Sequence, residues 1–168
     1  MSALIVTAEL GVQDFAWLDR LRREHFPPER NQLPAHLTLF HALPPSADTE
    51  IRHLLATLAA RPRPAAEVAG LINLGRGVAF RVVSVDLEQI RGEIADHFHG
   101  SMTSQDAQGW RPHVTVQNKV EPKVARALLH ALQPGFRPRP LAIAGLGLHR
   151  YLGGPWERLG NWSFRGVS

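Results

Sequence analysis

Cysteine is absent from this chain of 168 residues. Without thiols, the protein has no disulfide, zinc ribbon, iron–sulfur cluster or thiol nucleophile, and those classes are excluded. The absence also suits a reducing compartment. Long apolar runs are missing as well, because the apolar stretch at residues 3–10 is closed by Glu9, too early for a signal sequence or a membrane span. We therefore expect a soluble, cytoplasmic protein with no membrane partner.

Lysine is scarce: the chain has 2 lysines among 19 basic residues, a formal net charge of +4 and a sequence pI of about 10.6. The arginine excess indicates either a surface for phosphate groups or a GC-rich coding bias, and composition leaves both interpretations open. With 44% hydrophobic and 20% charged residues, the chain is typical of a folded protein. Its length allows one ordinary domain or two small lobes that share a core.

Four short segments of the first half recur, in the same order, in the second half. Their offsets are 77, 77, 76 and 75 residues, for the pairs 4–10 and 81–87, 36–39 and 113–116, 61–64 and 137–140, and 68–71 and 143–146. We predict a single domain, 1–168, built by duplication of about residues 3–75 and 79–150, with a C-terminal extension at 151–168. Two units are too few for a solenoid, which needs about three. They favour two lobes around a pseudo-twofold axis.

Each unit has the pattern strand, helix, strand, helix, strand. The second helix shows it best, because Ile51, Leu54, Leu55 and Leu58 recur at the spacing of one helical face. The turn at residues 75–77 separates the units. The expected strands are 3–10, 36–41, 66–74, 78–85, 113–118 and 141–149, with a possible last strand at 162–164. The expected helices are 14–25, 48–60, 87–98 and 122–135.

Two of these strands each carry a histidine and a threonine two residues apart: His36 with Thr38, and His113 with Thr115. Alternation places each pair on one face of its strand, while the apolar residues between them pack under the helices. Twofold symmetry then brings both pairs to one cleft, with two imidazoles and two hydroxyls around a phosphorus. One histidine can act as base and the other as acid. Hydroxyls and nearby cations can stabilise the charge without a metal.

The sequences Pro-Ala-His-Leu-Thr-Leu-Phe at residues 34–40 and Arg-Pro-His-Val-Thr-Val-Gln at residues 111–117 resemble the paired motifs of the 2H phosphoesterases, or 2′–5′ RNA ligase-like proteins. The resemblance implies a duplicated, two-lobed α+β fold with two mainly antiparallel sheets around a central cleft and helices outside. It also implies that His36 and His113 are the acid/base pair and that Thr38 and Thr115 bind phosphate oxygens. Relatives often carry an arginine shortly after the second motif, where this chain has Gln-Asn-Lys.

Six further residues are candidates for substrate binding, each with a plain packing or solvation role as the alternative. Strand parity places Phe40 and Gln117 on the cleft face, and Lys119 shares the parity of His113. Arg111 lies just before the second motif, and Arg150 and Tyr151 follow at the end of the strand at 141–149.

Parity and position also give expectations for other aromatic and histidine residues. His41 falls on the apolar face by parity, although its place at a strand end leaves its direction open. His149 is expected at the surface. Trp110, Trp156 and Trp162 are expected to pack in the core or between the lobes.

The sequence therefore predicts a metal-independent, monomeric phosphoesterase with no cofactor, acting on RNA ends or small nucleotides. Its partner is an RNA or nucleotide with a 2′,3′-cyclic phosphate or a 2′–5′ linkage. Opening the cyclic phosphate is the simplest reaction, and the reverse chemistry joins ends through a 2′–5′ bond. One alternative is a non-catalytic RNA-binding module whose affinity falls steeply with salt. Another is a divalent-metal nuclease, which EDTA would inactivate.

Overall fold

Two four-stranded antiparallel sheets form the framework of the computed structural model, which describes residues 2–167. The first sheet has the order β2-β1-β7-β8, and the second has the order β5-β4-β3-β6. The strands of the first sheet are β1 (Leu4–Leu10), β2 (Leu37–Leu43), β7 (Ile143–Tyr151) and β8 (Trp156–Ser163). Those of the second are β3 (Glu67–Asn73), β4 (Val78–Val83), β5 (His113–Gln117) and β6 (Arg139–Pro140).

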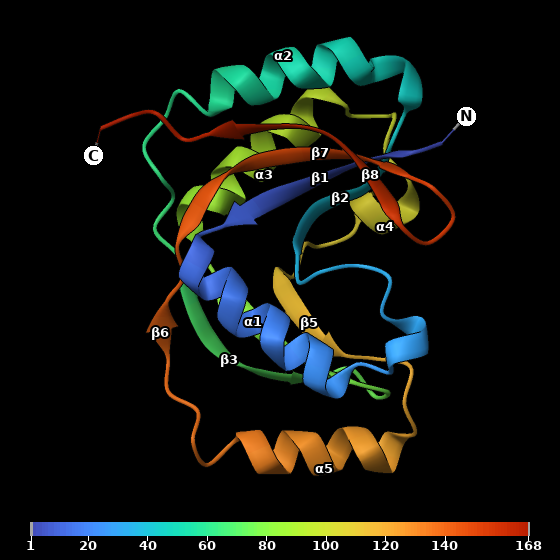
Figure 1. Ribbon diagram of the computed structural model, residues 1–168. Helices are drawn as coiled ribbons and strands as arrows, with labels where there is room; N and C mark the ends of the chain where they lie inside the picture. Colours follow the sequence, from blue (N-terminus) through green and yellow to red (C-terminus); the bar gives the residue numbers. More distant parts are fainter. Residues whose placement is uncertain (1, 168) are drawn as a thin grey trace.

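Five α-helices accompany the sheets, and the expected α+β fold with two antiparallel sheets is confirmed. Figure 1 shows α2 and α3 beside the first sheet and α5 beside β3 of the second, while α1 crosses to contact β5. The helices are α1 (Val12–His25), α2 (Asp48–Leu58), α3 (Val85–His97), α4 (Ser104–Ala107) and α5 (Pro122–Leu132), with 3-10 turns at Pro28–Arg30 and Pro45–Ala47. The sequence did not predict α4, β6 or the full length of β8.

The third strand of each sequence unit lies in the sheet of the other unit. β3, from the first unit, pairs with β4 of the second, and β7, from the second unit, pairs with β1 of the first. The two halves therefore interlock, and neither sheet consists of one unit alone. A continuous apolar core that draws on both sheets follows from this exchange. The duplication itself stays a prediction from the sequence.

A β-bulge in β2 reverses the expected direction of two side chains. Thr38 pairs with Thr7, but Phe40 pairs with the very next residue of β1, Val6, so Leu39 is an extra residue. Such a bulge shifts the alternation of faces by one position. Phe40 is consequently 0% exposed in the core, and its predicted place on the cleft face is wrong. His41, assigned to the apolar face by parity, turns to the cleft instead.

An equivalent bulge occurs in β5. Thr115 pairs with Ala79 and Gln117 pairs with Val78, so Val116 is the extra residue. Gln117 is therefore turned inward and is 4% exposed, and its predicted place on the cleft face is wrong as well. Among the described residues, its Oε1 atom is one of the buried oxygens without a hydrogen-bond donor. A buried polar atom without a partner lowers stability.

The substitution Gln117→Met is expected to stabilise the protein by about 1 kcal/mol, because it removes this unpaired oxygen at similar volume. The melting temperature should rise by roughly 2–4 °C. The matched control is Gln89→Met, at an exposed position of α3, which should give no gain. A lower melting temperature for Gln117→Met in thermal unfolding would contradict the inward orientation of an unpaired amide.

Candidate active site

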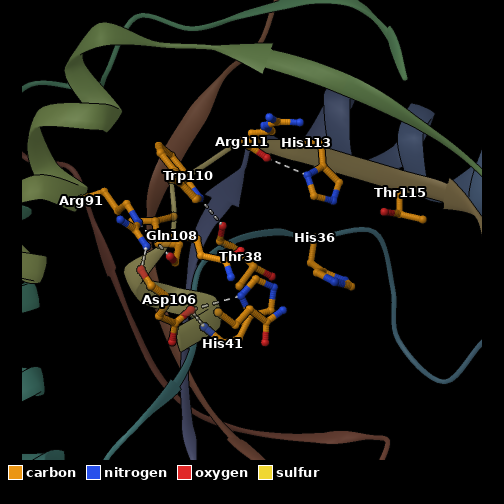
Figure 2. A pocket seen from close by; sticks show the side chains of 13 residues that line it. His36, Thr38, His41, Arg91, Asp106, Gln108, Trp110, Arg111, His113 and Thr115 are labelled. Atoms are coloured by element: carbon orange, nitrogen blue, oxygen red, sulfur yellow. Dashed lines mark hydrogen bonds and ion pairs between the residues drawn. The ribbon is translucent and has the colours of Figure 1, made fainter. Parts of the chain in front are cut away.

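A cavity of about 680 Å³ lies between the two sheets and contains both His-x-Thr pairs. His36 directly precedes β2 and His113 begins β5, and Figure 2 shows both rings in the cavity with Thr38 and Thr115 beside them. The sequence therefore placed these four side chains in one cleft correctly. The remaining lining residues are Leu39, His41, Arg91, Gln105, Asp106, Gln108, Gly109, Trp110 and Arg111.

The two catalytic candidates are oriented by the same backbone contact. His36 Nδ1 lies 2.8 Å from the carbonyl oxygen of Pro34, and His113 Nδ1 lies 2.7 Å from that of Arg111. Because a carbonyl oxygen only accepts, each Nδ1 carries the hydrogen. Each Nε2 is then left with its lone pair available toward the cavity, as a general base requires.

Buried or half-buried donors anchor the backbone of both motifs. Trp110 Nε1 donates to the carbonyl oxygen of Thr38 at 3.0 Å, and Arg22 Nη1 donates to that of Thr115 at 3.0 Å. Arg91 Nε donates to the carbonyl oxygen of Leu39 at 3.1 Å. These bonds fix the strand segments from which the threonine hydroxyls face the cavity. They also occupy donors of Arg22 and Arg91, and Arg111 is left as an exposed arginine on the cavity wall.

The two histidines differ in their surroundings. The ring of His36 packs against Trp156, with 4.7 Å between ring centroids. Burial, with a smaller effect from the neighbouring Arg22, His113 and His149, lowers the pKa of His36 to about 4, against the opposing effect of the Pro34 carbonyl. His36 is therefore neutral at physiological pH. Since unfolded histidine titrates near 6.5, protonation between about pH 6.5 and 4 favours the unfolded chain.

A second cavity, of about 340 Å³, lies on the other side of His36. Its lining includes His149, whose Nε2 lies 3.0 Å from Thr7 Oγ1 and whose ring centroid lies 5.3 Å from that of Trp156. Burial, and then the charge of Arg158, lowers the pKa of His149 to about 4. His149 and Trp156 thus line this cavity together with His36, whereas His149 was expected at the surface.

Three weaker candidates lie outside both cavities, whereas Arg111 lines the larger one. Lys119 is exposed and has a positive φ of 64°. Arg150 is paired with Glu157 at 2.5 Å and lies 3.9 Å from Asp48. Tyr151 is 45% exposed at the end of β7. Lys119, Arg150 and Tyr151 are thus not among the residues that line either cavity, and a contact of theirs with substrate stays a prediction.

Eight residues that line the cavity were not among the predicted site residues: Leu39, His41, Arg91, Gln105, Asp106, Gln108, Gly109 and Trp110. His41 reaches the cavity only because of the bulge at Leu39. Asp106 and Gln108 lie in or beside α4, a helix of 4 residues, which is too short to produce a periodic pattern. The signal in the sequence that could have indicated this wall of the cavity is the loop before the second motif, where Gln105, Gln108 and Trp110 carry hydrogen-bond donors.

Among residues 2–167, no group of three or more histidine, aspartate or glutamate side chains is arranged to hold a metal ion. No helix in that part of the chain has the length and apolar character needed to cross a membrane.

Several solved structures have the same fold as this chain. The protein TT0787 of Thermus thermophilus superposes with a TM-score of 0.65 at 18% identity, covering 99% of this chain and 100% of that one. E. coli LigT complexed with 3′-AMP gives 0.60 at 18% identity, covering 97% and 98%. A further phosphoesterase gives 0.56 at 19% identity, covering 98% and 99%. The sequence has no match among curated proteins.

These similarities show that the chain has the same two-sheet fold as these proteins. The family model of the 2′-5′ RNA ligase superfamily matches residues 11–155, a span that includes both His-x-Thr pairs. The chain belongs to this superfamily, the 2H phosphoesterases.

The substitution Trp156→Ala should raise the pKa of His36 from about 4 toward 6.5, because water then reaches the ring that the indole covers. Titration of the histidine resonances by NMR measures this directly. The control is Trp162→Phe, a conservative change further along β8, which should leave the midpoint near 4. A wild-type midpoint near 6.5 would show that Trp156 does not enclose His36.

Proposed function

We propose that this protein is a metal-independent phosphoesterase that opens 2′,3′-cyclic phosphates at RNA ends or on small nucleotides. The supporting observation is that two imidazoles with available Nε2 atoms enter one cavity, each beside a threonine. A phosphodiester between them would have a base on one side of the phosphorus and an acid on the other. The threonine hydroxyls would hold its non-bridging oxygens.

The different surroundings of the histidines assign their roles in this proposal. A general base must be neutral, and the enclosed His36 has a pKa lowered to about 4. His36 Nε2 takes a proton from water as the water oxygen bonds to phosphorus. The bond from phosphorus to one ribose oxygen breaks, and His113, which enters the step protonated on both ring nitrogens, gives that oxygen the proton of its Nε2. A nucleoside phosphomonoester results, and the proton gained by His36 returns to His113 through solvent.

Charge on the phosphate requires cationic or hydrogen-bonding partners in the cavity. Arg111 is exposed on the cavity wall, whereas Arg91 donates from Nε and Nη2 to the carbonyl oxygens of Leu39 and Asp106. Arg111 is therefore the cation that we assign to the phosphate, together with the hydroxyls of Thr38 and Thr115. Arg111 lies before the second His-x-Thr motif, whereas relatives often carry an arginine after that motif.

The second cavity favours a second candidate reaction. Because both cavities share His36 as a wall, a diester with a nucleoside on each side of the phosphorus fits the cleft. Cleavage or formation of a 2′–5′ bond uses such a substrate, with a ribose hydroxyl in place of water in the joining direction. E. coli LigT, which shares the fold, has been solved with 3′-AMP and with phosphate.

Removal of either imidazole should abolish most activity on nucleoside 2′,3′-cyclic phosphates. We expect His36→Ala and His113→Ala each to lower kcat/KM by about 10²–10⁴-fold, the usual contribution of a general acid or base. His130→Ala is the matched control, since His130 is exposed on α5, and it should retain full activity.

The same assay distinguishes the alternatives. Full activity of folded His36→Ala and His113→Ala proteins would overturn the catalytic role. RNA affinity that falls steeply with salt and ignores both substitutions would indicate a binding module. Loss of wild-type activity in EDTA would indicate a metal-dependent nuclease.

The pH dependence of kcat/KM should report the low pKa of the base. On the acidic side, activity should persist until the pH approaches about 4, because His36 stays neutral above that value. Trp156→Ala should move this acidic limb upward, toward pH 6.5, and Trp162→Phe should leave it in place. An acidic limb that Trp156→Ala does not move would assign the base to another group.

A further inference from the structure

A third histidine enters the larger cavity and is not one of the duplicated pair. His41 lies on β2, three residues after Thr38, and the bulge at Leu39 brings both side chains to the cleft. The position equivalent to His41 at an offset of 77 is Asn118. His41 therefore has no histidine counterpart in the second motif, and the paired acid/base arrangement does not account for it.

The ring of His41 is held by a buried carboxylate. Asp106 is 1% exposed, and its Oδ1 lies 3.2 Å from His41 Nδ1. The backbone N–H groups of His41 and Ala42 donate to Oδ1 and Oδ2 at 2.8 and 2.9 Å. These bonds outweigh the opposing effect of burial and lower the pKa of Asp106. Asp106 is thus an ionised and well-bonded support for the ring.

The other edge of the ring is available. The side chain of His41 is 46% exposed while its Nδ1 faces Asp106, and Figure 2 shows this ring next to Asp106 on the side of the cavity that also holds His36. Because the Asp106 carboxylate only accepts, Nδ1 of His41 donates to it, and the Nε2 edge of the ring is left to donate an N–H to a phosphate oxygen in the cavity. Because both oxygens of Asp106 are bonded and buried, that carboxylate presents little free charge to an incoming anion.

We propose that His41, supported by Asp106, is a second phosphate-binding site beside the reacting phosphate. The proposal rests on the proposed function and narrows its substrates to nucleotides with at least two phosphate groups. An RNA end and a 5′-phosphorylated nucleoside cyclic phosphate both meet this requirement. Three residues of strand separate Thr38 from His41, at most roughly 10 Å, and one ribose links two phosphates across a comparable distance.

Two substrates that differ by one phosphate test the proposal. They are adenosine 2′,3′-cyclic phosphate and the same compound with a 5′-phosphate. We expect wild-type protein to prefer the second by about tenfold in kcat/KM, as one charge-assisted hydrogen bond at a half-exposed site provides. His41→Ala should reduce this preference to about one, and His41→Lys should restore part of it. The matched control is His97→Ala, which removes an exposed histidine paired with Glu50 and should keep the preference.

Equal preference in wild-type and His41→Ala proteins, or no wild-type preference, would overturn the proposal. Thermal unfolding checks that each variant is folded, and His41→Gln replaces any variant that is not. If the wild type hydrolyses neither compound, the proposed function is wrong. In that case calorimetry tests the phosphate site at His41 directly, through the Kd values of adenosine 2′-phosphate and adenosine 2′,5′-bisphosphate. Tighter binding of the bisphosphate by the wild type, lost in His41→Ala, would support the site, and an unchanged ratio of the two Kd values would overturn it.

Discussion

Hydrogen bonds from two arginines hold the histidine strands in their relative positions. Arg22 extends from α1, in the first half of the chain, to β5 in the second, and Arg91 extends from α3 back to β2. Burial lowers the pKa of Arg22 to about 10, so the guanidinium stays charged at neutral pH and its bond is a strong one. Each half thus fixes the backbone of the other half's motif, and the width of the cleft depends on both contacts.

The exchange of third strands adds to the same constraint. Because β3 and β7 each lie in the sheet of the opposite unit, the two sequence units cannot separate without breaking strand pairs. Acid/base chemistry needs its two groups within a few tenths of an ångström of productive positions. Two sequence units joined by strand pairs in both sheets supply such positions more securely than two lobes joined by a flexible linker.

The alternation of side chains along a strand correctly predicted the face on which the catalytic candidates lie. Two residues further along the same strand, it predicted the wrong face for Phe40. His36 and Thr38, and their counterparts in β5, precede the bulges, so parity places them correctly. Phe40 and His41 follow a bulge and exchange faces, and nothing in the local pattern signals the extra residue. Asp106 lies in a helix of 4 residues. Trp156 begins a strand that is defined by its pairing with β7 rather than by periodicity.

The indole of Trp156 covers His36, while no equivalent ring among the described residues stacks on His113. A symmetric cleft would accept a diester in either direction along the groove. With one side enclosed and the other open to water, the two directions become inequivalent, and a ligand with unlike ends has a single favoured orientation. In the reaction that we propose, the orientation of the bound diester is therefore set by one aromatic side chain on the β7–β8 hairpin.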